Sequence, residues 1–148
     1  SLSGWLRLGS GISGRCAMDG DFVEFRVDGV PVQQGSKTVA QYGGKAWLRD
    51  ANGKKLKPWR RLVAEAADLG VSFDCPVKVT LRFEMPRPKR PKFVRPAVKP
   101  DADKLARAVL DSLTDAGLLA DDSRVVDLHV TEFYSETPGV VVTVREVD

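Results

Sequence analysis

Four aspartates stand in two pairs within residues 99–130, KPDADKLARAVLDSLTDAGLLADDSRVVDLHV. Asp101 and Asp103 precede a helical pattern, and Asp121 and Asp122 follow it. Carboxylate oxygens are the hard ligands that Mg²⁺ and Mn²⁺ prefer, and these ions also bind substrate phosphate. A metal held in this way activates water and neutralises the charge that develops during phosphodiester hydrolysis. Three converging carboxylates would therefore make a hydrolytic metal site.

The same aspartates also have an ordinary structural interpretation. Aspartate at a helix start is a common cap that contributes ~1 kcal/mol, and paired aspartates are common in turns. Asp122 comes near Asp101 and Asp103 only if the loop doubles over the helix N-terminus or if the next strand runs antiparallel to the helix. The spacing alone leaves both interpretations open.

Charge is divided unevenly along the chain. Residues 1–99 hold 19 Lys and Arg against 9 Asp and Glu, whereas residues 100–148 hold 4 against 11. Six cations and no acid lie in the proline-rich segment 86–99, PRPKRPKFVRPAVK, which we call the basic arm. A concentrated positive field is what a surface that contacts nucleic-acid phosphates requires. A solvated linker stiffened by proline is the alternative interpretation.

The elements that must position these residues alternate between strands and helices. Alternating apolar residues predict strands at 22–28, 77–85, 124–133 and 140–144, and a hairpin within 37–48. One helix is predicted to have Pro58 in its first turn and to stop at Gly70. A second follows Pro100 and is capped by Gly117. These elements predict one compact α+β domain, a mixed sheet with two helices packed on it, after an N-terminal extension at residues 1–21.

Composition argues against several other classes of protein. The 148 residues are 43% hydrophobic and 29% charged, as in an ordinary globular domain. No apolar run approaches the ~20 residues that cross a bilayer, and the first seventeen residues lack the apolar core of a secretion signal. Cys16 and Cys75 do not make a disulfide framework, and a lone histidine argues against a His-rich metal site. We therefore expect a cytoplasmic protein with no membrane partner and no small-molecule cofactor.

The run from Pro100 to Val130 resembles the core motif of RusA-type Holliday-junction resolvases. That family carries two aspartates one residue apart, a helix, and a paired-aspartate turn that opens a strand. PDADKL, LDSLTDAG and LLADDSRVVDLHV follow that order here. The segment FRVDGVPVQQGSKT is similar to the family's opening strand, its proline turn and the Gly-Ser-Lys that follows. The resemblance covers roughly residues 22–145, and it defines a RusA-like domain at 22–148 that includes the basic arm.

The resemblance implies a Mg²⁺-dependent endodeoxyribonuclease, with Mn²⁺ as the other possible ion. Such an enzyme resolves four-way junction DNA by paired cuts, acts as a homodimer and works in the cytoplasm of a bacterial or phage-infected cell. The metal-binding and catalytic carboxylates would be Asp101, Asp103 and Asp122, with Asp121 as an accessory or alternative ligand.

The expected DNA-binding residues are the cations of the basic arm, its one aromatic residue and a lysine of the second helix. Stacking of Phe93 on an unpaired base at the branch point would contribute ~1–3 kcal/mol, and core packing is the alternative. These residues are Arg87, Lys89, Arg90, Lys92, Phe93, Arg95, Lys99 and Lys104.

Two positions depart from the family's pattern. Lys104 stands where the family usually has Asn, and Arg107 stands where it usually has Lys. Arg107 keeps a cation that can contact phosphate, so we place it among the catalytic residues. A guanidinium does not titrate as an ammonium does, which calls into question any role in proton transfer. The alternative is an i,i+4 ion pair with Asp103 or Asp111, worth ~0.2–0.5 kcal/mol.

Two other classes of function stay open. One is a nucleic-acid-binding module without catalysis, in which the aspartates are caps and turns. The other is a protein-docking subunit whose basic arm binds an acidic partner. Strand cleavage stimulated by a divalent metal distinguishes the enzyme from both, and salt-dependent binding of nucleic acid distinguishes the module from the docking subunit.

Overall fold

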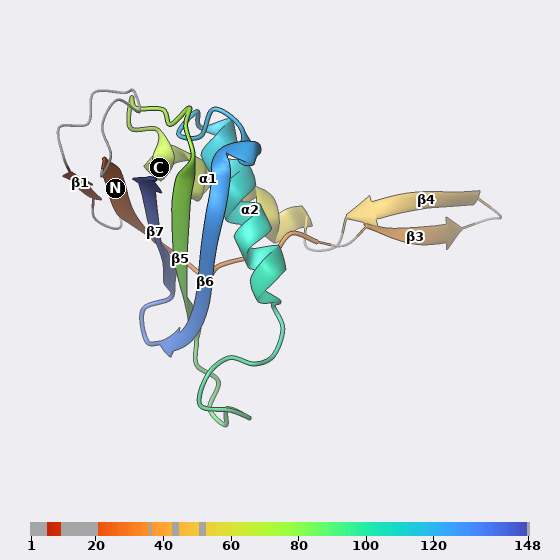
Figure 1. Cartoon of the computed structure of the whole chain (residues 1–148). Helices are drawn as coiled ribbons and strands as arrows, with labels where there is room; N and C mark the ends of the chain where they lie inside the picture. Colours follow the sequence, from red (N-terminus) through yellow and green to blue (C-terminus); the bar gives the residue numbers. More distant parts are fainter. Residues whose placement is uncertain (1–5, 10–20, 36, 43–44, 51–52, 148) are drawn as a thin grey trace.

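The computed structural model describes residues 6–9, 21–35, 37–42, 45–50 and 53–147. Five strands form the main sheet in the order β1-β2-β7-β5-β6, and two helices cover one face of it (Figure 1). The strands of this sheet are β1 (Leu6–Gly9), β2 (Phe22–Asp28), β5 (Val77–Pro86), β6 (Val125–Ser135) and β7 (Gly139–Glu146). The helices are α1 (Gly53–Ala67) and α2 (Ala102–Asp115), and the 3₁₀ turn η1 (Asp122–Arg124) follows α2. A separate hairpin pairs β3 (Lys37–Tyr42) with β4 (Lys45–Asp50).

The connection between β5 and β6 positions the aspartates. These two strands pair in parallel, whereas the other neighbouring strands of the described sheet pair antiparallel. Parallel strands need a crossover rather than a tight turn, and here the crossover consists of the basic arm, α2 and η1. The first turn of α2 therefore lies near the end of the sheet where β5 and β6 finish, and β6 begins beside the other end of α2 (Figure 1).

The core lies between the sheet and the two helices. Alternate residues of β5, such as Val79, Leu81 and Phe83, are buried because strand side chains point to opposite faces in turn. α2 buries one stripe of apolar residues and α1 buries another, at the spacing that places side chains on one side of a helix. The buried stripes are Leu56, Trp59, Val63 and Ala67 in α1 and Leu105, Val109 and Leu113 in α2.

The predicted fold class, an α+β domain with a mixed sheet and two helices, is confirmed. The strands predicted at 22–28 and 77–85 correspond to β2 and β5, and those predicted at 124–133 and 140–144 correspond to β6 and β7. The alternation of apolar and polar residues predicted β2, β5 and β7 because alternate side chains of these strands are buried in the core. β6 lies at the edge of the described sheet, and its side chains are partly buried or exposed.

The prediction that places Pro58 in the first turn of the first helix is wrong. α1 begins at Gly53, and Pro58 lies inside it. A proline inside a helix removes one backbone hydrogen bond, and the burial of Leu56 and Trp59 on either side offsets that loss. The predicted cap of the second helix is confirmed, because Gly117 follows the last turn of α2 with a φ of 84°.

Parts of the sequence prediction fall outside the described residues, among them Cys16 and the turn at Gly43-Gly44. Of the predicted N-terminal extension, Leu6–Gly9 is described, and it forms the unpredicted strand β1, which pairs with β2. Cys75 is disulfide-bonded, which is a single bridge rather than a framework. Within the described residues, no helix is long and apolar enough to span a membrane.

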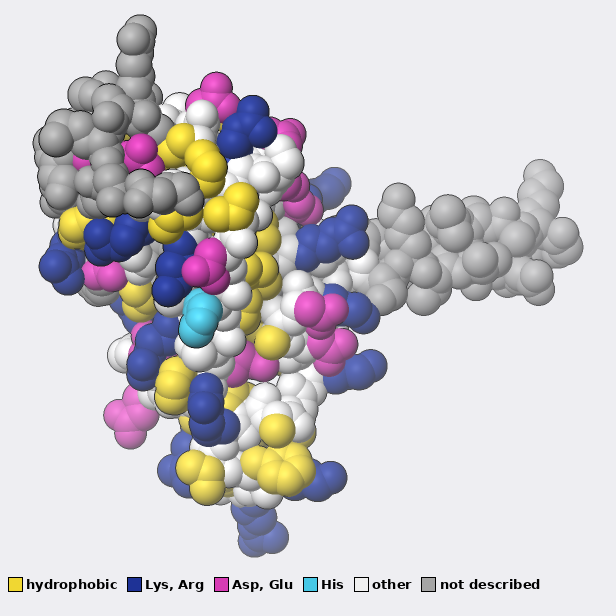
Figure 2. Space-filling view, in the orientation of Figure 1, with side chains coloured by type: hydrophobic (Ala, Val, Ile, Leu, Met, Phe, Trp, Pro, Cys, Tyr) yellow, Lys and Arg dark blue, Asp and Glu magenta, His cyan; other side chains and the backbone are white. Residues whose placement is uncertain are grey.

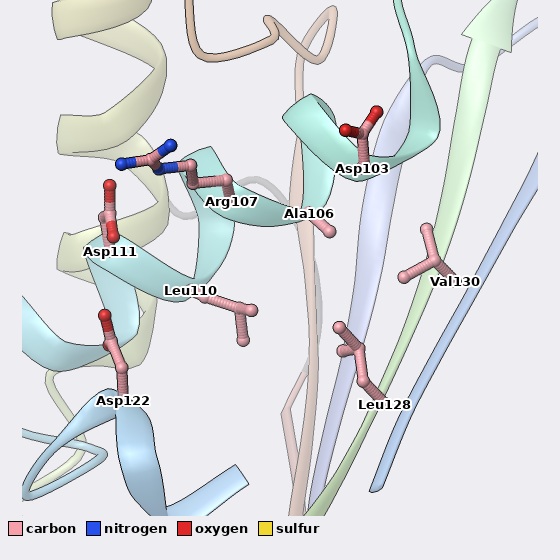
Figure 3. A pocket seen from close by; sticks show the side chains of 8 residues that line it. All are labelled: Asp103, Ala106, Arg107, Leu110, Asp111, Asp122, Leu128 and Val130. Carbon is pink, nitrogen blue, oxygen red and sulfur yellow. The ribbon is translucent and has the colours of Figure 1, made fainter.

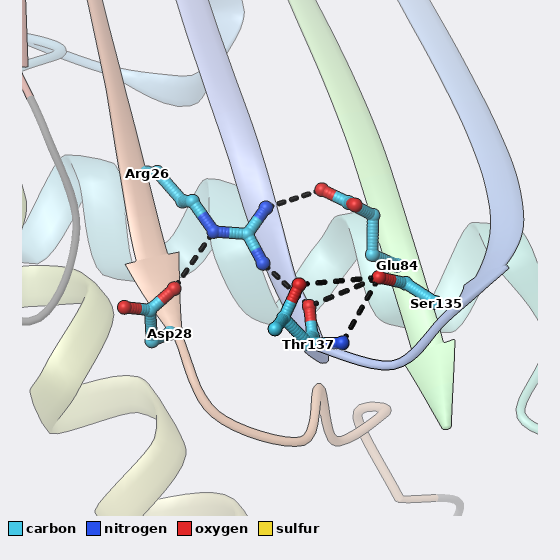
Figure 4. A network of polar contacts seen from close by, with 5 residues as sticks. All are labelled: Arg26, Asp28, Glu84, Ser135 and Thr137. Carbon is cyan, nitrogen blue, oxygen red and sulfur yellow. Dashed lines mark hydrogen bonds and ion pairs between the residues drawn. The ribbon is translucent and has the colours of Figure 1, made fainter. Parts of the chain in front are cut away.

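One network of polar contacts joins three segments at the end of the sheet near the arm (Figure 4). Arg26 Nε donates a hydrogen bond to Asp28 at 2.7 Å, and the terminal nitrogens of Arg26 donate to Glu84 and, at 2.6 Å, to the Thr137 carbonyl. The network therefore connects β2, β5 and the turn between β6 and β7. Gly139, the first residue of β7, leaves the space that the Arg26 side chain occupies.

We expect Gly139→Ala to lower the free energy of unfolding by about 1–3 kcal/mol, because the substitution overpacks a closed site. A Cβ at this position would lie 2.6 Å from the Val27 carbonyl oxygen and 2.8 Å from Arg26 Nη2. The matched control is Gly53→Ala, where a Cβ meets nothing within 4 Å. Urea unfolding of both variants checks the prediction, and equal midpoints for the two would contradict it.

Candidate active site and nucleic-acid interface

A pocket of about 490 Å³ lies between α2, η1 and β6 (Figure 3). Its polar wall on α2 carries Asp103, Arg107 and Asp111, which are spaced at i, i+4 and i+8 and therefore share one face of the helix. Its other lining residues are Ala106, Leu110, Asp122, Leu128 and Val130. The pocket combines an apolar floor with three carboxylates and one guanidinium.

The first two aspartates lie at the N-terminal end of α2. Asp101 occupies the N-cap position, but its carboxylate makes no capping hydrogen bond. That carboxylate lies 3.7 Å from the Lys104 ammonium, and Asp103 follows in the first helical turn with its side chain exposed. The capping interpretation therefore does not describe what the carboxylate of Asp101 does. The positive end of the helix dipole favours the negative charge of both residues and of any anion bound there.

Glu132 is a carboxylate beside Asp101 that the sequence analysis did not identify. It lines a neighbouring pocket together with Asp101 and Lys99. Burial raises the pKa of Glu132, and the charge of Asp101 raises it further. Oε1 of Glu132 is buried and has no hydrogen-bond partner among the described residues. The signal in the sequence was an acid in phase with Leu128 and Val130, on the side of β6 that faces the helices.

The two adjacent aspartates after α2 have different surroundings. Asp121 accepts hydrogen bonds from the backbone N–H of Ser123, at 2.9 Å, and from the Ser123 hydroxyl, so it caps η1. These hydrogen bonds lower the pKa of Asp121. Asp122 lines the pocket and accepts a hydrogen bond from the Thr114 hydroxyl. Asp121 thus fits the structural interpretation, whereas Asp122 faces the candidate site.

The structure does not bring Asp101, Asp103 and Asp122 into one contact. α2 separates the first two from the third, and a helix of 14 residues spans roughly 21 Å. β6 runs antiparallel to α2, so the strand begins beside the C-terminal end of the helix. The antiparallel strand therefore does not bring Asp122 near Asp101 and Asp103. Among the described residues, no three His, Cys, Asp or Glu side chains could hold one metal ion.

The donor set nevertheless fits the chemistry of magnesium. Mg²⁺ usually keeps several waters and binds one or two carboxylates together with substrate phosphate, rather than a cage made only of protein ligands. Asp101 and Asp103 offer hard oxygen ligands at the helix terminus, and the buried, unpartnered oxygen of Glu132 lies beside Asp101. A cation at this end of α2 would relieve the repulsion between Asp101 and Glu132.

The guanidinium of Arg107 makes no ion-pair contact with a described carboxylate, although its charge opposes the burial that raises the pKa of Asp111. None of the described carboxylates forms an ion pair with its guanidinium, so the predicted alternative, an i,i+4 pair, is not present as a contact. Asp111, which the sequence analysis considered only as a pairing partner, lies near Asp122 at the far end of the pocket (Figure 3). Burial raises the pKa of Asp111, with the charge of Arg60 opposing this effect and that of Asp122 adding to it.

The basic arm extends from the end of β5 to Asp101 without regular secondary structure. Its six cations form no ion pair with a described carboxylate, and Figure 2 shows Lys and Arg side chains around apolar ones at the lower end of the molecule. Phe93 is 46% exposed, with the Lys92 ammonium 5.5 Å from its ring centroid. The sequence left core packing of Phe93 open as an alternative. The structure does not support it, because the ring is exposed.

Cations without ion pairs beside a pocket lined with carboxylates are what a protein that acts on a polyanion needs. The family model "Endodeoxyribonuclease RusA" matches residues 28–145. The chain is also similar to "Uncharacterized protein YqaN" of Bacillus subtilis (strain 168), with 36% identity over 140 residues. The match covers 86% of this chain and 98% of that protein. The chain belongs to the RusA endodeoxyribonuclease family, so the resemblance inferred from the sequence is confirmed.

Proposed function

We propose that this chain is a divalent-metal-dependent endonuclease that resolves four-way DNA junctions by paired cuts, as a homodimer. The observation that carries the proposal is the position of Asp101 and Asp103. They lie directly after an arm of six cations without ion pairs and at a helix terminus that favours anions. Membership of an endodeoxyribonuclease family supports DNA hydrolysis as the reaction.

Asp101 and Asp103 would hold the metal, with Mg²⁺ or Mn²⁺ as the expected ion. Asp122 lies too far away, at the other end of the same pocket, to ligate this ion. It would instead ligate a second ion there, with Asp121 as an accessory ligand. A bound divalent ion would supply activation of water and neutralisation of the charge that develops on phosphate. Arg107, which faces the pocket without an ion pair, would hold a non-bridging phosphate oxygen by the planar fork of its guanidinium.

The basic arm would hold the DNA during cleavage. Phosphate contacts from its cations and from Lys104 would position the duplex without reading its sequence. The exposed ring of Phe93 would stack on a base that is unpaired at the branch point, since aromatic stacking tolerates any base. Branched DNA would then be preferred because intact duplex offers no unstacked base.

The test is cleavage of a synthetic four-way junction with Mg²⁺ and with a chelator. We expect paired cuts with Mg²⁺ and intact but bound junction without it, because the arm does not need the metal to contact phosphate. Junction binding without cleavage under any divalent ion would favour the binding module. Absence of DNA binding at low salt would favour a protein-docking subunit.

The homodimer is tested by sedimentation at micromolar concentration. Paired cuts related by a twofold axis need two active sites, and one chain supplies a single set of carboxylates. We expect a dimer that persists at salt concentrations that release DNA, because an apolar interface is not screened by salt. A monomer that yields only nicked products would contradict the resolvase proposal and would favour a nick or flap endonuclease.

A further inference from the structure

The face of the sheet that points away from both helices carries an aromatic ring with two arginines over it. Arg82 of β5 alternates with the buried residues Leu81 and Phe83, so it lies on this open face. The pairing of β5 with β6 places Glu84 opposite Phe133, and Phe133 therefore shares the open face with Arg82.

Two guanidinium groups lie over the ring of Phe133. The guanidinium carbon of Arg82 is 4.0 Å from the ring centroid, and that of Arg95, from the basic arm, is 4.2 Å from it. Arg95 Nε also donates a hydrogen bond to the Glu132 carbonyl at 3.0 Å, which fastens the arm to β6. Neither guanidinium forms an ion pair with a described carboxylate.

Such an arrangement favours an anion. Two like charges held over one ring repel each other, and the cation–π contacts that hold them contribute only about 0.5–1 kcal/mol each at an exposed site. A bound phosphate would relieve this repulsion. Arginine suits that ligand because its planar fork forms two parallel hydrogen bonds to phosphate oxygens, and stacking on Phe133 holds the fork in one orientation.

The position of the stack connects it with the candidate active site. β6 is the edge strand of the described sheet, and its adjacent residues Glu132 and Phe133 point to opposite faces. Glu132 lies beside Asp101 on the helix side. A DNA strand that passes Asp101 would therefore reach the Phe133 stack by continuing around the edge of β6.

We propose that Arg82 and Arg95, stacked on Phe133, form a second phosphate-binding site that holds DNA on the open face of the sheet. The occupant is a duplex arm of the substrate, as the two guanidinium groups without an ion pair to a described carboxylate and their position around the edge of β6 from Asp101 indicate. This inference rests on the proposed function, and it extends the DNA-binding surface beyond the basic arm and the pocket.

The test measures the affinity of the full chain for a four-way junction as a function of salt, for Arg82→Ala and Arg82→Lys. We expect Arg82→Ala to reduce the slope of log affinity against log salt by roughly 0.9, the value for one lost contact to duplex phosphate. Arg82→Lys should keep the slope, since it keeps the charge. The matched control is Arg7→Ala at the opposite edge of the sheet, where Arg7 pairs with Glu24 at 3.2 Å, and it should leave the slope unchanged.

An unchanged slope in Arg82→Ala, with or without a lower melting temperature, would overturn the proposal, because Arg82 would then only pack on Phe133. An equal loss of slope in Arg7→Ala would also overturn it, because the effect would then be one of net charge. Failure of this site can be distinguished from failure of the proposed function. In the second case the unmodified chain would not cleave the junction with Mg²⁺.

Discussion

Asp103→Asn is expected to abolish junction cleavage while junction binding stays intact or becomes tighter. The substitution removes a carboxylate that would ligate the metal, and it also removes a negative charge that repels phosphate. Turnover should fall below about a tenth of the wild-type value, an order-of-magnitude threshold for the loss of a metal-mediated step. Single-turnover cleavage and fluorescence anisotropy on the same junction measure the two effects separately.

Asp115→Asn is the matched control for this substitution. Asp115 is the last residue of α2, is exposed and pairs with Arg60 at 2.7 Å outside the pocket. We expect this variant to retain full turnover. Cleavage by Asp103→Asn above the threshold would remove Asp103 from the active site, even if Asp115→Asn behaved as expected.

The same assay separates the two aspartates that follow α2. Asp122→Asn should reduce cleavage because Asp122 faces the pocket, where the Thr114 hydroxyl holds its carboxylate. Asp121→Asn should mainly affect stability, because Asp121 caps η1 through its hydrogen bonds to Ser123. The opposite ranking would make Asp121 the functional member of the pair.

Replacement of four cations of the basic arm by alanine is expected to weaken binding to all DNA shapes. Each lost contact to duplex phosphate lowers the slope of log affinity against log salt by roughly 0.9, so loss of all four contacts should lower it by roughly 3.6. The affinity should fall most at low salt, where release of counterions contributes most. The variant changes Arg87, Lys89, Arg90 and Lys92, which are exposed and form no ion pair with a described carboxylate.

A variant of α1 with the same change in charge is the comparison for the arm. It replaces four exposed cations by alanine, namely Lys54, Lys55, Lys57 and Arg61. A smaller change in slope for this variant would assign the phosphate contacts to the arm. An unchanged slope in the arm variant would mean that the arm does not touch phosphate, and a loss confined to junctions would indicate recognition of the branch point instead.

Local patterns predicted most of the fold. β2 and β5 were predictable because each buries one face, so that apolar and polar residues alternate. The start of α1 was not predictable from these patterns, because Pro58 is a frequent first-turn residue. The buried Leu56, which lies in the first turns of α1, depends on tertiary packing that the local pattern does not show. Strand β1 was missed for a related reason, since its pairing with β2 is a contact between distant segments.

By itself, the sequence determined which residue types are available, in what order, and where the charge is concentrated. The aspartates at the two ends of α2, the six cations of the arm and the family membership all follow from the order of residues. Only the tertiary structure decided which carboxylates face each other. It placed Glu132 beside Asp101 and Asp111 near Asp122, and it separated these two groups by most of the length of α2. The physical reason is the parallel pairing of β5 and β6, which forces α2 to run back along the sheet, so that residues close in one motif come to lie at opposite ends of a helix.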